Sequence, residues 1–388
     1  MSRIKVSVFS QILQVIDRQI VYKCIRKHDS DKYAKGINTW AHMVCMLFCH
    51  LAKVGGIRDI TNGLSSSAGN LNHLNMQFAP SKSSISYINK NRTWEVFKDI
   101  YMGLLEKLEP SLQQRRKYAH RLKRKIFIMD SSTISLCLSL FDWAKYKRRK
   151  GAIKLHTILD YDTCLPTYMY LTDGKKHDVT VAKELIMPSG SVIVMDRAYV
   201  DFKWLFKLDS TDSFFVTRLK KGTLFEVAES FLTDDKKECI LSDQDIRLLG
   251  KDTSIAYPKK LRVVRVYDER NGQVIHLLTN NMFWTAQTIS ELYNARWDIE
   301  VFFKTIKQSL KIKEFIGLSE NAVLIQVWTA MITILLLKYL QNKAKHSWHL
   351  SNLVGLLRIH LFSKINIFTW LDKPFLKNHD PPKLATLF

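Results

Sequence analysis

Two apolar runs of the chain each end in an aspartate. The segments "KIFIMDSS" and "SVIVMDRAY" are rich in isoleucine and valine, which indicates buried strands with Asp130 and Asp196 at their carboxyl ends. A buried carboxylate is costly unless a cation compensates its charge, and oxygen-only ligands favour Mg²⁺ or Mn²⁺ over zinc. Together with a third acid, Glu300, two such ions could activate water and stabilise the leaving oxygen of a phosphodiester. The alternative is that each aspartate only caps a loop.

The third acid lies in "ELYNARWDIEVFFKTIKQSLK", where Tyr293, Arg296, Glu300 and Lys307 are spaced 3, 4 and 7 apart. On one helix beginning near Thr288, at about 100° per residue, these side chains fall within a sector of about 60° beside an apolar stripe. Such a set suits a phosphate backbone, because arginine clamps phosphate bidentately, lysine supplies a point charge and tyrosine donates or stacks. The alternative is an exposed helix face with an Arg296–Glu300 ion pair, which predicts no link to the two strand-end aspartates.

The charge of the chain favours a polyanionic partner. Its 388 residues include 59 Lys and Arg against 36 Asp and Glu, a net charge of +23, and 46% of the residues are apolar. This length and composition suit a globular protein of two or three domains. The positive field suits nucleic acid, although a basic protein tuned only for solubility is the alternative.

Signals for a structural metal, a membrane or export are weak. The six cysteines form no CxxC pair, which favours reduced, mostly buried thiols in a cytosolic protein. The group His42, Cys45, Cys49 and His50 lies in "AHMVCMLFCHLA", an apolar helix pattern that favours core packing over a zinc site. We expect no signal peptide. The apolar segment 322–338 is shorter than a membrane span, so we expect a buried helix and no membrane contact.

The pattern of elements divides the chain into five regions. Helical patterns dominate both ends, and short β-type runs separated by turn signals form an insertion before the helix that carries the third acid. In the first region, the helices at "GIRDITNGL" and "SSISYINKNRTWEVF" would suit a helix-turn-helix, but solvated surface helices explain them equally well. The expected regions are a helical N-terminal DNA-binding domain (1–115), the first part of a catalytic core (116–220), a β-rich insertion (221–286), the second part of the core (287–345) and a C-terminal helical region (346–388).

These residues resemble a known family. The segment "YNARWDIEVFFKTIK" matches the Y-(2)-R-(3)-E-(6)-K signature of insertion-sequence transposases of the IS-four type, and "MDSST" and "MDRAY" look like that family's two aspartate motifs. The stretches "GIRDITNGL", "SSISYINKNRTWEVF" and "KLHTILDYD" are similar to a subgroup with its own helical N-terminal domain, so the resemblance covers roughly residues 5–340. It implies an α/β, ribonuclease H-like mixed sheet flanked by helices, with the β-rich insertion before the last catalytic helix.

The resemblance also implies the site and its chemistry. The acids Asp130, Asp196 and Glu300 would bind two Mg²⁺ (or Mn²⁺) ions as a DDE catalytic triad. The expected reaction is hydrolytic nicking at the end of the element, attack by the freed 3′-hydroxyl, in relatives through a hairpin, and strand transfer into target DNA. Some relatives flip a base onto a tryptophan, for which Trp297 and Trp284 are candidates. Further residues expected near the DNA are Tyr293, Arg296, Lys307, Lys154, His156 and His177.

The sequence thus favours a cut-and-paste DNA transposase that acts in a prokaryotic cytoplasm, at the nucleoid. Its partners would be double-stranded DNA, both terminal inverted repeats and target, and a second copy of the chain in the synaptic complex. One rival is a metal-dependent ribonuclease H-like nuclease or resolvase that does not transfer strands. The other is a basic DNA-binding protein that does not cut.

Overall fold

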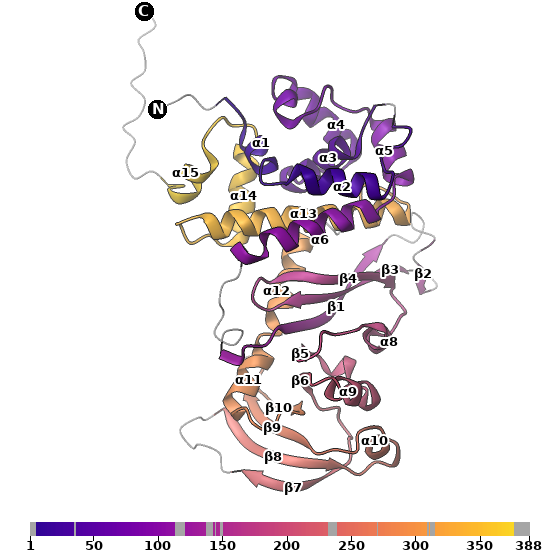
Figure 1. The fold of residues 1–388 in the computed structure, drawn as a ribbon, viewed down its shortest axis with the longest axis vertical. Coiled ribbons are helices and arrows are strands. Elements are labelled where there is room, and N and C mark those ends of the chain that lie inside the picture. Colours follow the sequence, from indigo (N-terminus) through magenta and orange to yellow (C-terminus); the bar gives the residue numbers. More distant parts are fainter. Residues whose placement is uncertain are drawn as a thin grey trace, which may run out of the picture. The chain divides into compact units, whose positions relative to one another are not determined.

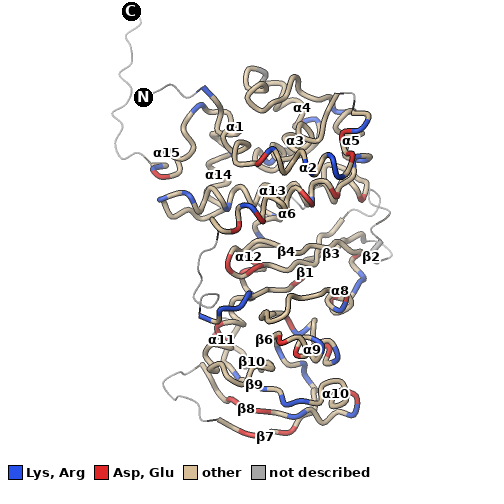
Figure 2. The backbone as a smooth tube through the Cα atoms, viewed as in Figure 1, with Lys and Arg blue, Asp and Glu red and all other residues tan. Residues whose placement is uncertain are grey.

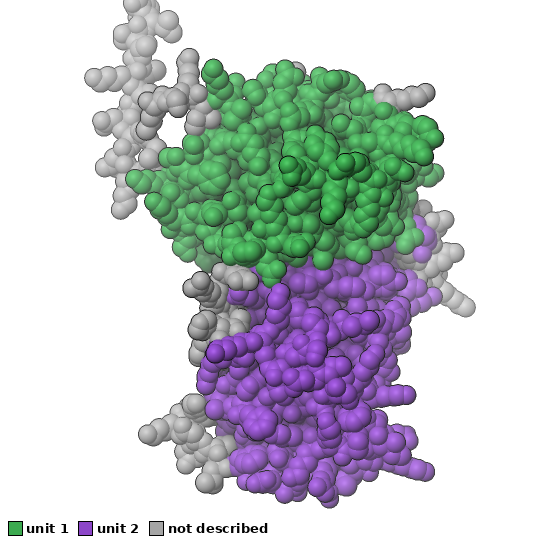
Figure 3. Space-filling view, in the orientation of Figure 1, with its two compact units in different colours: residues 1–112, 305–388 green, residues 113–304 purple. Residues whose placement is uncertain are grey.

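Two compact units make up the chain in its computed structural model (Figures 1 and 3). Unit 1 comprises Met1–Leu112 and Thr305–Phe388, and unit 2 comprises Gln113–Lys304. Both ends of the chain therefore contribute to unit 1, while unit 2 is continuous. The structure describes residues 5–34, 36–112, 121–136, 143, 145–147, 150–231, 239–269, 271–308, 310 and 315–375.

Unit 2 is built on a ten-stranded mixed sheet with the order β2-β3-β1-β5-β6-β10-β9-β8-β7, in which β4 pairs with β3 off this path. Strand β1 is antiparallel to β3 and parallel to β5, and β5 is parallel to β6. The order β4-β3-β1-β5-β6 with these directions is that of a ribonuclease H-like sheet, as the resemblance implies. The strands of this part are β1 (Ile126–Leu136), β2 (Lys145–Lys147), β3 (Lys150–Asp160), β4 (Leu165–Asp173), β5 (Val192–Met195) and β6 (Phe214–Arg218).

The β-rich insertion extends the same sheet. Strand β10 pairs antiparallel with β6, and β9, β8 and β7 follow in an antiparallel meander. These strands are β7 (Phe225–Phe231), β8 (Ile240–Leu248), β9 (Leu261–Asp268) and β10 (Gln273–Thr279), so all four β-type runs expected from the sequence form strands. The helices of unit 2 are α8 (Asp178–Glu184), η2 (Arg197–Tyr199), α9 (Phe202–Asp209), α10 (Lys251–Ala256), α11 (Ala286–Asn294) and most of α12 (Trp297–Gln308).

The central strands are apolar on both faces. All four residues of β5 are fully buried, as are the first four of β1. On one face Phe127, Met129 and Met195 pack in a core that includes Trp204 and Leu208 of α9. A parallel strand covered on both faces must be apolar throughout, which explains why "IFIM" and "VIVM" read as continuous runs. The polar residue that follows each of these apolar runs is therefore held in position by the buried strand residues before it.

Unit 1 is helical and centred on one long helix, α13. The helix α13 packs against α3, α5 and α6. This helix is long and apolar enough to cross a membrane. However, 83% of the apolar stretch that meets this criterion is buried within the protein, so α13 is the core helix that the sequence predicts. The elements are α1 (Val8–Leu13), α2 (Arg18–Lys27), α3 (Thr39–Ala52), α4 (Ile57–Ser66), η1 (Ala68–Leu74), α5 (Lys82–Asn91), α6 (Glu95–Leu112), α13 (Glu320–Lys343), α14 (Leu350–His360) and α15 (Ile367–Asp372).

The two ends of the chain are joined by hydrogen bonds. The amides of Val8 and Phe9 donate to the carbonyls of Ser363 (3.0 Å) and Leu361 (2.8 Å). The Gln11 side chain donates to a further carbonyl of the C-terminal region, at Ile365, over 2.7 Å. Helix α1 thus satisfies its first amides and its glutamine with residues more than 350 positions away in the sequence.

The polar residues of α3 serve the core. Both histidines are fully buried: His42 pairs with Asn89 of α5 over 2.7 Å, and His50 contacts the Leu310 carbonyl and the Thr329 hydroxyl. The thiols of Cys45 and Cys49 are buried on the same helix. The burial and the partners of these side chains place them in the core of unit 1. Cys137 lies outside the described residues.

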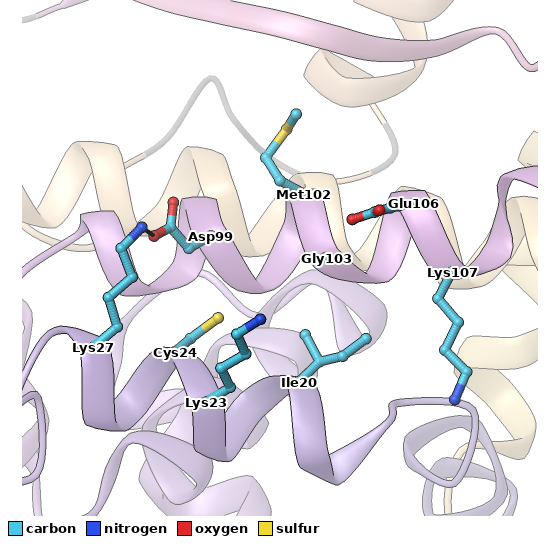
Figure 4. A pocket seen from close by; sticks show the side chains of 9 residues that line it. All are labelled: Ile20, Lys23, Cys24, Lys27, Asp99, Met102, Gly103, Glu106 and Lys107. Atoms are coloured by element: carbon cyan, nitrogen blue, oxygen red, sulfur yellow. Dashed lines mark hydrogen bonds and ion pairs between the residues drawn. The ribbon is translucent and has the colours of Figure 1, made fainter.

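A pocket of about 600 Å³ opens between α2 and α6 (Figure 4). Its charged side chains are largely paired with each other or with neighbours, as Lys27 is with Asp99 and Lys107 with Asp17. The lining consists of Ile20, Lys23, Cys24, Lys27, Asp99, Met102, Gly103, Glu106 and Lys107, and includes none of the acids singled out in the sequence.

Candidate active site

Asp130 and Asp196 lie on adjacent parallel strands. The register pairs Met129 of β1 with Met195 of β5, so the two aspartates that come next are at the same level of the sheet. Asp196 follows the last residue of β5, as the sequence predicts. Asp130 lies inside β1, which continues to Leu136 because its outer half still pairs with β3, so its predicted place at the end of a strand is wrong. Each carboxylate accepts a hydrogen bond from the amide of the next residue, Ser131 (2.7 Å) in one case and Arg197 in the other. Two adjacent buried strand segments therefore hold the two acids side by side.

Asp130 has an environment that disfavours its charge. The pKa of Asp130 is raised to about 6, mainly by burial and to a smaller extent by the negative charges of Asp196 and Asp178. The Ser131 amide and the guanidinium of Arg296 act in the opposite direction. The raised pKa of this carboxyl therefore records mainly its burial, and a bound cation would favour its charged form.

The helix with the third acid is broken where the sequence predicts one continuous helix. Helix α11 ends at Asn294 and α12 begins at Trp297. At the break the amide of Ala295 donates to two carbonyls, and that of Arg296 donates to Tyr293 only three residues back, which is the tight pattern of a 3₁₀ turn. No glycine or proline signals this break. The four polar residues therefore do not form one stripe: Tyr293 precedes the break and Glu300 follows it.

Arg296, at the break, links the acids. Its Nη1 lies 2.7 Å from Oε1 of Glu300 and 3.6 Å from Oδ2 of Asp130. The arginine is 8% exposed, so it is not on a solvated helix face. Burial by itself lowers the pKa of Arg296, but Tyr293, Glu300 and Asp130 outweigh burial and raise it. The Arg296–Glu300 ion pair of the alternative interpretation is present. That interpretation also predicts no link between this pair and the aspartates, which is wrong because Arg296 contacts Asp130.

Aromatic rings enclose the same guanidinium. The Arg296 guanidinium carbon lies 5.8 Å from the ring centroids of both Tyr293 and Trp297, and Arg218 lies 5.3 Å from the Tyr293 ring. Tyr293 is 4% exposed and Trp297 36% exposed. Trp297 is therefore the tryptophan with a surface open to a ligand, whereas Trp284 packs edge-on against Phe214 at 5.1 Å.

Lys154 and His156 form a second charged group with an aspartate that sequence reasoning missed. The Asp178 carboxylate lies 3.3 Å from Nζ of Lys154 and 3.4 Å from Nδ1 of His156. His156 is opposite Ser131 in the β1–β3 register, one residue after Asp130. Burial lowers the pKa of His156 to about 4, so the imidazole is neutral near pH 7. His177 instead lies exposed at the start of α8. The only sequence signal for Asp178 is its place beside His177.

Lys307 lies seven residues after Glu300 on α12 and is partly buried. Two helical turns separate these residues, about 10 Å along the axis at 1.5 Å per residue. The lysine is therefore on the same helix as the third acid but at its far end, in the part of α12 that belongs to unit 1.

The carboxylates at this site are the kind of ligand that a hard divalent cation binds. All three acids offer oxygen, and a cation would stabilise the charged form of Asp130, whose pKa burial raises. In this structure the guanidinium of Arg296 lies between the carboxylates of Asp130 and Glu300, where a cation would bind. Among the described residues, no three acids are close enough together to hold a metal. Figure 2 shows further acids on β7 and β8, but there Asp243 is paired with Arg262 over 2.6 Å.

Comparisons with known proteins point to one family. Residues 121–336 match the profile described as "Transposase DDE domain", and residues 5–77 match a "Domain of unknown function (DUF4372)". A Sinorhizobium fredii protein named as transposase y4zB is 30% identical over 67% of this chain and 71% of its own length. A Geobacillus stearothermophilus protein named as a transposase for insertion sequence element IS5377 is 29% identical over 66% and 67%. The cryo-EM structure of a piggyBac transposase synaptic complex with hairpin DNA aligns at TM-score 0.46 and 10% identity over 94% of this chain and 82% of that chain.

Proposed function

Because this chain belongs to the DDE transposase family, we propose that it cuts DNA at the ends of an insertion sequence and joins them to target DNA. The observation that carries the proposal is the placement of Asp130 and Asp196 at the same level of two adjacent parallel strands, with Arg296 reaching from Asp130 to Glu300. Asp130, Asp196 and Glu300 are the proposed catalytic acids. They would hold two Mg²⁺ or Mn²⁺ ions, which supply Lewis acidity to the phosphoryl group and lower the pKa of an attacking water.

The proposed reaction is a series of displacements at phosphorus. In the first, water attacks the phosphodiester at the end of the element, the bond to the 3′-oxygen breaks, and a 3′-hydroxyl and a 5′-phosphate result. That hydroxyl attacks the opposite strand to form a hairpin, which a second water opens. The 3′-hydroxyl of the released end then attacks a target phosphodiester, and a target 3′-hydroxyl leaves. Each step exchanges one P–O bond for another, so no oxidant or external energy source is required.

The chain's own residues would bind and orient the DNA. Arg296 compensates the carboxylates when no cation is present, and we propose that it turns to a scissile-strand phosphate when a cation replaces it. Lys307, farther along α12, would hold a neighbouring phosphate, and Trp297, with its open surface, would stack on a displaced base. Lys154 and His156, fixed by Asp178 beside Asp130, would border the same strand. A homodimer would bring two ends together in the prokaryotic nucleoid.

A strand-transfer assay with a pre-cut element end tests the proposal. We expect the full-length protein to join that end to plasmid DNA in Mg²⁺, and Asp130→Ala to lose cleavage and joining while it retains DNA binding. Cleavage without joining would instead indicate a nuclease or resolvase on the same fold. Unchanged activity of Asp130→Ala would show that this aspartate takes no part in the reaction.

A further inference from the structure

Helices α3 and α4 form a bent pair with a short turn. They meet at 97° and are separated by residues 53–56. The turn begins at Lys53, which has the left-handed backbone (φ 56°), and ends at Gly56, the N-cap of α4. The amide of Gly55 donates to the Asp59 carboxylate over 3.1 Å, so the only acid of α4 is engaged in the turn. Two helices at about 90–120° with a glycine-containing turn of three or four residues have the geometry of a helix-turn-helix.

The angle between the helices is fixed by close packing. A Cβ added to Gly63 of α4 would lie 2.7 Å from the ring of Phe48 in α3. The ring therefore lies directly over the glycine backbone, and a larger residue at position 63 would force the two helices apart. Ile60 and Leu64, both fully buried, complete the contact surface of α4.

The opposite face of α4 is polar and open. Arg58, Asn62 and Ser65 are exposed, and at about 100° per residue they fall within about 60° of one another, opposite Ile60 and Leu64. Within the described part of the chain, neither the Arg58 nor the Asn62 side chain has a hydrogen-bond or ion-pair partner. Arginine and asparagine are the side chains that make bidentate contacts to guanine and adenine in the major groove.

The neighbouring helix α5 adds positive charge. Helix α4 packs against α5, whose Lys82, Tyr87 and Lys90 are exposed. Residues 53–92 contain five Lys or Arg and a single acid, Asp59. One of the five, Arg92, is buried, and the four exposed cations are complementary to a phosphate backbone.

We propose that α3 and α4 form a sequence-reading helix-turn-helix within the region that matches a domain of unknown function, and that α4 enters the major groove of double-stranded DNA. Arg58 and Asn62 read base edges, and Lys82 and Lys90 hold phosphates. This corrects the pairing suggested by the sequence, because α4 and α5 are separated by η1 and a loop, residues 67–81, rather than by a turn. The inference rests on the proposed function only in supposing that the chain recognises specific DNA.

Selection from a pool of duplexes with random base pairs tests it. The full-length protein is used in EDTA, so that no metal-dependent cleavage occurs. We expect the wild type to select a defined site. Asn62→Ala and Arg58→Ala should each lose preference at one or two adjacent base pairs by about 5- to 150-fold. Lys90→Ala should keep every base preference, bind all sites more weakly, and reduce the slope of log K against log salt by about one.

Controls separate this inference from the proposed function. Arg247→Ala, a change of an exposed arginine in β8, should leave the selected site unaltered. Gly63→Leu should abolish selection by opening the helix pair, and circular dichroism would show whether its helices persist. If the wild type selects a site and the α4 variants keep all base preferences, the inference is overturned while the proposed transposition stands. If the wild type joins a pre-cut end but selects no site, the helix-turn-helix is equally excluded.

Discussion

Replacement of Arg296 by glutamine tests how the acids are held before a cation binds. The change removes the guanidinium that lies 2.7 Å from Glu300 and 3.6 Å from Asp130. The Glu300 side chain is 37% exposed, so its ion pair contributes only about 0.5–1 kcal/mol. Asp130 is more buried, and loss of a countercharge beside a buried carboxylate costs about 1–2 kcal/mol more. We expect Arg296→Gln to lower the free energy of unfolding of unit 2 by about 1–3 kcal/mol.

The distinguishing measurement is the effect of Mg²⁺ on that loss. If the cation takes the place of the guanidinium, Mg²⁺ should stabilise the variant more than the wild type, because in the wild type it must first displace Arg296. A tenfold excess over Kd contributes about 1.4 kcal/mol. Urea unfolding with and without Mg²⁺, followed by tryptophan fluorescence, measures both values.

A buried arginine elsewhere in the sheet is the control. Arg262 donates to both oxygens of Asp243, over 2.7 and 2.6 Å, and strands β6 and β10 separate this pair from the aspartates. Arg262→Gln should cost about 3–5 kcal/mol, and Mg²⁺ should not restore it. Equal stabilisation of the wild type and both variants by Mg²⁺ would refute the idea that Arg296 occupies the place of a cation.

Three further predictions concern single groups. Lys307→Ala should weaken binding of the element end and flatten its salt dependence by about one charge, and an unchanged slope in a salt titration would exclude a phosphate contact. Asp178→Asn should lower the free energy of unfolding by about 1–2 kcal/mol, and a double-mutant cycle with Lys154→Met should give a coupling energy clearly different from zero. Burial lowers the pKa of His42 to about 3 and that of His50 to about 4. The unfolded chain binds protons there from about pH 6.5 downward, so stability should fall between pH 6.5 and 4, by about 2 kcal/mol per histidine at pH 5. His50→Gln should be less sensitive to acid in urea unfolding at pH 7 and pH 5, and an equal loss in the variant would contradict the assignment.

The two apolar runs and the acids that follow them were predictable because their signal is local, although β1 continues beyond Asp130 to Leu136 and does not end there as predicted. A run such as "VIVM" is apolar on both faces only if the strand is central, and the aspartate that follows it is the first residue free to be polar. The ribonuclease H-like order of the central strands also followed, through the resemblance, from motifs carried by those strands.

The break before α12 and the partners of Arg296 were not predictable, because both depend on contacts distant in sequence. Nothing in "NARWD" disfavours a continuous helix, yet the 3₁₀ turn there brings Arg296 within reach of Asp130, which is 166 positions earlier. Asp178 was missed for the same reason. Its role appears only when β3 and α8 bring Lys154 and His156 to it.

The hydrogen bonds between the two ends of the chain mean that helix α1 gains these partners only after residues 361–365 have been synthesised. Helix α1 bonds to residues 361–365, and α3 and α6 pack on α13, so the DNA-reading surface we infer is supported by helices that are synthesised well after it. A nascent or prematurely terminated chain would carry α4 without the support that fixes it. We expect such a chain to bind DNA more weakly than one that includes α13 and residues 361–365.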